Sequence, residues 1–133
     1  MSFAADSGAC ATVADPSELP NHTVTETTAS NAGECFTAAS GDPIPNLGGM
    51  RLPIVTREST NRLMQVTAAP VTKPLLSVKQ LCRMGHVVAS EEDCSYRINT
   101  ATNEYNLLRE DNGNFMLDVW APPNLEAGFV GRP

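Results

Sequence analysis

Short apolar runs separated by turn-forming residues dominate the pattern of hydrophobic and polar positions along this chain. Ten prolines and nine glycines interrupt the sequence throughout, and few of the runs between them show a helical period. Because proline lacks the N–H of an interior strand residue, these runs are expected to form short strands. The pattern predicts strands near residues 3–5, 11–14, 23–27, 34–38, 44–47, 51–56 and 63–69.

One segment, residues 75–84, is predicted to be helical. Its apolar side chains fall on one face at helical spacing (Leu75, Val78, Leu81 and Cys82). Ser77 is suited to begin the helix and Gly85 to end it. Cys82 is therefore expected in the core, and a strand resumes at residues 86–89, with His86 at its start.

The last third of the chain is predicted to be a β-meander. Strands near residues 95–99 and 104–108 flank a polar turn, and the sequence Asp111-Asn112-Gly113-Asn114 is a strong turn signal before a strand at residues 115–120. Aromatic and sulfur-containing side chains are expected to pack in the interior (Phe115, Trp120, Met50, Met64, Met84 and Met116). The fold class is therefore mostly β with one short helix.

Composition narrows the class of protein. The 133 residues fit one domain, 41% are hydrophobic, and the net charge is −6. Lys and Arg are scattered, which argues against a nucleic-acid surface, and no apolar run is long enough for a membrane span. The first residues do not resemble a signal peptide, so we expect an intracellular, cytoplasmic protein whose four cysteines are free thiols.

The stretch most informative about chemistry is Asp6-Ser7-Gly8-Ala9, which lies between two apolar runs. An aspartic protease requires two carboxylates close enough to share one proton, so that one activates water and the other protonates the substrate carbonyl. Ser7 is expected to donate a hydrogen bond that holds the loop, and Gly8 to permit close backbone approach. Since the chain has one such sequence, a second chain must supply the second carboxylate.

Two further features follow in order. The runs on either side of Ala39-Ser40-Gly41-Asp42 form a predicted hairpin with a tip of small residues, suited to close over a bound peptide. Downstream, Leu75-Leu76-Ser77-Val78-Lys79-Gln80-Leu81 leads to Gly85-His86-Val87-Val88.

Together these sequences resemble the protease region of retrotransposon polyproteins, especially the copia type, over roughly residues 3–120. The resemblance implies a small retropepsin-like closed β-barrel, the acid-protease half, with one short helix. It also implies an aspartic endopeptidase that is active as a homodimer on peptide or polyprotein substrates. Asp6 would be the catalytic carboxylate, residues 7–9 its supporting loop and residues 39–42 the flap tip. No cofactor, metal, nucleic acid or membrane partner is expected.

The same resemblance divides the chain into a protease domain (1–92), a C-terminal β-meander extension (93–121) and a loosely ordered tail (122–133). The sequence also departs from the family pattern. Few residues precede Asp6, whereas the family has a longer N-terminal strand in its dimer interface. Cys10 and Ala11 stand where related retroviral enzymes carry aspartates.

Other interpretations stay open. The chain could be a catalytically inactive, protease-like β domain that serves as a polyprotein segment or interaction module. A cysteine hydrolase would use Cys82 or Cys10 with His86 or His22. A zinc site built from Cys82, His86 and Cys94 lacks the closely spaced ligand pair that such sites favour.

Overall fold

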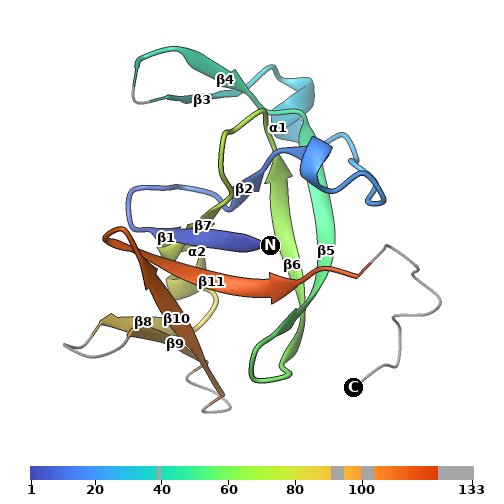
Figure 1. Cartoon of the computed structure of the whole chain (residues 1–133). Coiled ribbons are helices and arrows are strands. Elements are labelled where there is room, and N and C mark those ends of the chain that lie inside the picture. Colours follow the sequence, from blue (N-terminus) through green and yellow to red (C-terminus); the bar gives the residue numbers. More distant parts are fainter. Residues whose placement is uncertain (39, 91–94, 100–103, 123–133) are drawn as a thin grey trace.

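The computed structural model describes residues 1–38, 40–90, 95–99 and 104–122 (Figure 1). Over this part of the chain the protein is mostly β, as predicted, with two short α-helices instead of one. The strands are β1 (Ser2–Asp6), β2 (Val13–Ala14), β3 (Cys35–Thr37), β4 (Pro43–Pro45), β5 (Gly48–Thr56), β6 (Asn61–Ala68), β7 (Leu75–Ser77), β8 (His86–Ser90), β9 (Ser95–Asn99), β10 (Tyr105–Asp111) and β11 (Asn114–Trp120). The helices are α1 (Thr28–Asn31) and α2 (Val78–Arg83), with one 3-10 turn, η1 (Pro16–Glu18).

A mixed sheet organises the molecule, and its strands pair in a closed ring of hydrogen bonds in the order β1, β7, β2, β6, β5, β11 and back to β1. β7 runs parallel to β1, whereas β11 runs antiparallel to it and pairs Leu117 with Phe3. β11 then reaches β5, where Val119 pairs with Thr56. β10, β9 and β8 extend the sheet outward from β11 (Figure 1).

The core is formed by apolar side chains from the strands of this ring. Phe3, Leu52 and Val66 come from β1, β5 and β6, and none of them has exposed surface. Because burying one such side chain stabilises the fold by about 2–3 kcal/mol, β1 is fixed by packing as well as by its two neighbouring strands. The other buried core side chains are Ala14, Leu19, Met50, Ile54, Ala68, Leu76, Leu108, Leu117 and Val119.

The predicted helix begins later than expected, because residues 75–77 form β7 and only residues 78–83 are helical. Ser77 is the N-cap, and its hydroxyl accepts a hydrogen bond from the Gln80 amide at 3.0 Å. Gly85 follows the helix with φ of 85°, a conformation that glycine adopts without strain. These two predictions of the helix ends are confirmed.

Four predictions about local structure and burial are wrong. Cys82 is exposed rather than in the core, and Met84 and Trp120 are 62% and 61% exposed. Cys82 and Met84 are exposed because α2 has only six residues, too few to bury a complete helix face. Residues 23–27 form no strand, and only Thr25 bridges to Gly49, because Thr27 and Ser30 cap each other and begin α1.

The end of the described chain belongs to the same sheet as its beginning. β10 and β11 form a hairpin whose turn residues, Asn112 and Gly113, have φ of 50° and 82°, so the predicted turn is confirmed. The predicted turn at residues 100–103, the tail beyond residue 122 and the boundary at residues 92 and 93 lie outside the described residues. The division into domains stays a prediction, and β11 pairs with strands from the other side of that boundary.

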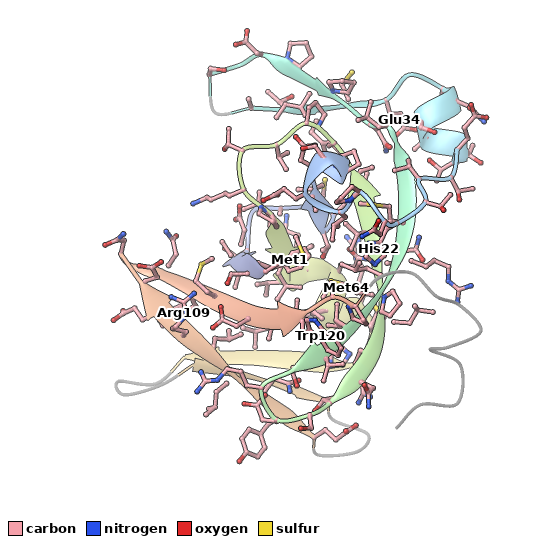
Figure 2. All side chains as sticks on the ribbon, turned by 45° about the vertical axis from the view of Figure 1, so that its right-hand side comes forward. Met1, His22, Glu34, Met64, Arg109 and Trp120 are labelled. Atoms are coloured by element: carbon pink, nitrogen blue, oxygen red, sulfur yellow. The ribbon has the colours of Figure 1, made fainter. Side chains whose placement is uncertain are left out.

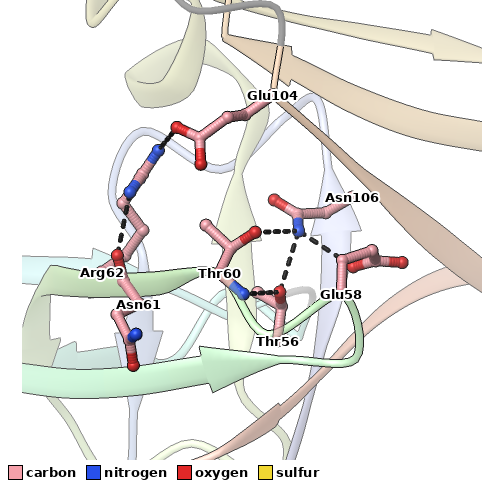
Figure 3. Close-up of polar contacts among 7 residues, drawn as sticks. All are labelled: Thr56, Glu58, Thr60, Asn61, Arg62, Glu104 and Asn106. Carbon is pink, nitrogen blue, oxygen red and sulfur yellow. Dashed lines mark hydrogen bonds and ion pairs between the residues drawn. The ribbon is translucent and has the colours of Figure 1, made fainter. Parts of the chain in front are cut away.

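A buried polar cluster joins β10 to the turn between β5 and β6 (Figure 3). Asn106 is fully buried, and its side-chain NH2 lies within hydrogen-bond distance of three acceptors: Thr56 Oγ1 at 2.9 Å, Glu58 Oε1 at 2.9 Å and, at a longer 3.3 Å, Thr60 Oγ1. Burial raises the pKa of Glu58, but hydrogen bonds from Asn106 and the Leu107 amide outweigh this effect and lower it below its usual 4.5.

An ion pair between Arg109 and Asp118 lies beside the β1–β11 pairing. Arg109, on the β10–β11 hairpin (Figure 2), donates from Nε and Nη2 to the two carboxylate oxygens of Asp118 at 2.8 and 2.9 Å. The hydroxyl of Ser2 on β1 donates to the same carboxylate. The hydrogen bonds from Arg109 lower the pKa of Asp118 from its usual 3.8 to about 2.

Within the described residues, no helix is long and apolar enough to cross a lipid bilayer.

We predict that Asn106→Ala lowers the free energy of unfolding by about 2–3 kcal/mol, because the buried Thr60 hydroxyl loses its donor and the Thr56 hydroxyl loses one of two. Urea denaturation measures the change. Asn114→Ala, on the exposed end of β11, is the matched control, with an expected change within about 0.5 kcal/mol. Equal effects of the two substitutions would show that the cluster does not stabilise the fold.

A second prediction concerns acid stability. Because the pKa of Asp118 is lower in the folded state, its contribution is complete above pH 3.8 and is lost as the pH falls toward about 2. Asp118→Asn removes this contribution, so the unfolding free energy of the variant should depend less on pH across that window. Urea titrations at several pH values test this, and identical pH dependence in the two proteins would contradict it.

Candidate active site

Asp6 is the last residue of β1, and the chain turns immediately after it. The loop that follows leads to β2, and β7 lies between β1 and β2 in the sheet, so that Ser77 pairs with Asp6 and Leu75 pairs with Val13. A strand buried on both sides thus delivers a half-buried carboxylate to the edge of the core. The sequence predicted this strand–aspartate–loop order.

The loop is folded around the carboxylate of Asp6. The Gly8 amide donates to Asp6 Oδ1 at 2.7 Å, and the Ala9 amide approaches the Asp6 carbonyl at 3.4 Å. A Cβ at Gly8 would lie 3.2 Å from Asp6 Oδ1, which is tighter than an ordinary contact. A glycine at this position therefore lets the backbone approach the carboxylate, as the sequence indicated.

Ser7 does not hold the loop within one chain. It is exposed, and its hydroxyl makes no hydrogen bond to another described residue. The residue that does hold the loop is Ser77, whose hydroxyl donates to the Ala9 carbonyl at 2.7 Å. The sequence identified Ser77 only as a helix cap, and no pattern in the sequence indicates the second contact.

The hairpin predicted around residues 39–42 is present as a separate two-stranded sheet, in which Phe36 of β3 pairs with Ile44 of β4. At its tip the Ser40 hydroxyl donates to Asp42 Oδ2 at 3.0 Å, while residue 39 lies outside the described part. Figure 1 shows the hairpin projecting from one end of the molecule, with its tip on the same side as the loop after β1, and Figure 2 agrees.

Directly after this hairpin, Gly48 and Gly49 at the start of β5 pack closely against Thr25. Gly48 has φ of 134°, and a Cβ there would lie 2.5 Å from the Thr25 carbonyl oxygen. The Thr25 amide also donates to the Gly49 carbonyl, and the Gly49 amide donates to the Thr25 carbonyl, each at 2.8 Å. The hairpin therefore projects from a fixed point where only glycine fits.

Among the described residues, no hydrogen bond joins Cys10 or Cys82 to His22 or His86. Cys10, Cys35 and Cys82 are exposed thiols, and the ring of His22 contacts the Pro122 carbonyl at 2.9 Å. His86 borders a mainly apolar cavity of about 90 Å³. The described residues contain no group of three or more metal-ligating side chains, while Cys94 lies outside them.

No family model matches the chain, and no curated protein or solved structure shows significant similarity to it.

Proposed function

We propose that this protein is an aspartic endopeptidase of the retropepsin type, a hydrolase that cleaves peptide bonds of polyproteins with two Asp6 carboxylates from a homodimer. The observation that carries the proposal is the hydrogen bond from the Gly8 amide to Asp6 Oδ1 in a tight loop at the end of a buried strand. It orients a half-buried carboxylate at the edge of the core, and no described residue forms an ion pair with it.

The contact between two motifs supports the resemblance to copia-type retrotransposon polyproteins. Asp6-Ser7-Gly8-Ala9 and Leu75-Leu76-Ser77-Val78 are about seventy residues apart in the sequence. They meet through the β1–β7 pairing and the hydrogen bond from Ser77 to Ala9. The closed ring of strands is compatible with the closed β-barrel that this family would have.

In the proposed reaction, the two Asp6 carboxylates share one proton and hold a water molecule between them. The ionised carboxylate takes a proton from this water as it attacks the substrate carbonyl, and the protonated one donates a proton to the carbonyl oxygen. Transfer of a proton to the leaving amine completes the cleavage. The β3–β4 hairpin is the proposed flap, which would cover the bound peptide and exclude solvent.

One chain cannot carry out this chemistry alone, because a single aspartate cannot act as both base and acid. The sequence has one Asp-Ser-Gly, so a second chain must bring its own Asp6. The second candidate function, an inactive protease-like β domain, is favoured by Ser7, which is exposed and does not hold the loop within one chain.

Asp6→Asn should abolish peptide cleavage and leave the fold intact, because an amide neither takes up nor shares the proton. Cleavage of a library of peptides and thermal unfolding measure the two effects. Glu110→Gln, which alters an exposed carboxylate on β10, should cleave at the wild-type rate. Full activity in a well-folded Asp6→Asn protein would exclude Asp6 as the catalytic residue.

Activity should depend on assembly. Below the dissociation constant of the dimer, the rate should rise with the square of protein concentration, since two chains form one site. Sedimentation velocity at the same concentrations identifies the dimer. A rate linear in protein concentration, from chains that sediment as monomers, would contradict a site shared between two chains.

A further inference from the structure

The loop that follows Asp6 is hydrogen-bonded to residues at the beginning of α2. We propose that Ser77 and Gln80 are positioning residues that set the geometry of this loop, a role that rests on the proposed function of Asp6. Neither residue is in the Asp-Ser-Gly motif, and neither carries a charge.

Ser77 has two roles with one hydroxyl group. This group donates to the Ala9 carbonyl at 2.7 Å and accepts from the Gln80 amide at 3.0 Å. The side chain is fully buried, so water cannot replace either bond. Because the acceptor role caps α2 and the donor role holds the loop, the loop cannot move far without a change at the beginning of the helix.

Gln80 holds the other end of the same loop. The Thr12 amide donates to Gln80 Oε1 at 3.1 Å, and the Thr12 hydroxyl accepts from the Ser77 amide at 3.0 Å. Thr12 is itself buried. Ser77, the cap of α2, therefore contacts the loop at Ala9 and Thr12, and Gln80 contacts it at Thr12. Ser7 and Gly8, between Asp6 and these contacts, are exposed.

The pairing of strands makes this support local to the carboxylate. Ser77 is directly opposite Asp6 in the β1–β7 pairing, and the carboxylate is in turn bound by the Gly8 amide. If the Ala9 and Thr12 contacts are lost, Gly8 is no longer held at the distance that orients Asp6. Small displacements of a reacting group lower the rate steeply, so we expect these contacts to affect turnover more than substrate binding.

Gln80 offers the cleaner test, because its side chain is only partly buried and borders the apolar cavity. Gln80→Met has similar length and removes the acceptor for Thr12, whereas Gln80→Glu retains an acceptor oxygen. We expect Gln80→Met to lower kcat about ten-fold, as for the loss of one hydrogen bond in the transition state. KM should change less than about two-fold, and Gln80→Glu should retain most of the activity.

Ser77→Ala and Thr27→Ala form a matched pair for the second residue. Both remove a side chain that caps a helix, but Thr27 caps α1 and makes no contact with the Asp6 loop. Ser77→Ala should lower kcat at least as much as Gln80→Met, whereas Thr27→Ala should not. Equal kcat in Gln80→Met and the wild type, or an effect confined to KM, would overturn the proposal.

A measurement that needs no activity separates this inference from the proposed function. Backbone ¹⁵N order parameters at Gly8 and Ala9 should fall from about 0.85 toward 0.6 or below in Gln80→Met and Ser77→Ala, and stay unchanged in Thr27→Ala. If no form of the protein cleaves peptides, this result still supports the positioning role. Unchanged order parameters in both loop variants would overturn it, whatever the activity.

Discussion

The pairing of β1 on both of its edges is the constraint on which the rest of the structure depends. This five-residue strand is hydrogen-bonded to β7 on one side and to β11 on the other, while Phe3 packs in the core without exposed surface. A strand so short would be marginal with one neighbour. With two, it delivers Asp6 to a defined position, and it closes the ring of strands that encloses the core.

This constraint couples β1 to β11, the last strand of the described residues. β11 holds β1 through backbone pairing and through the contact of Ser2 with Asp118, and β10 is fixed in turn by Asn106. A strand added before Ser2 could not pair with this edge of β1 while β11 is in place. Any strand from another molecule would have to pair elsewhere, because both edges of β1 are already paired with β7 and β11.

The sequence predicted the features that short-range chemistry determines. The loop after Asp6, the cap at Ser77, the glycine after α2 and the Asn112–Gly113 turn each depend on a few adjacent residues. The sequence did not predict the contacts between residues far apart along the chain. Nothing near Asn106 or Gln80 shows that one is buried beside Thr56 or that the other binds Thr12. The prediction that Trp120 lies in the core is wrong, because the burial of this side chain depends on where β11 lies in the sheet.

The most direct test of two Asp6 carboxylates in one site is a mixture of wild-type and Asp6→Asn chains, equilibrated at a fixed total concentration at which the protein is dimeric. If each site needs an aspartate from both chains, activity should fall as the square of the wild-type fraction, to about one quarter in an equal mixture. Activity that falls linearly, to about one half in that mixture, would mean that each chain works alone and would contradict the account.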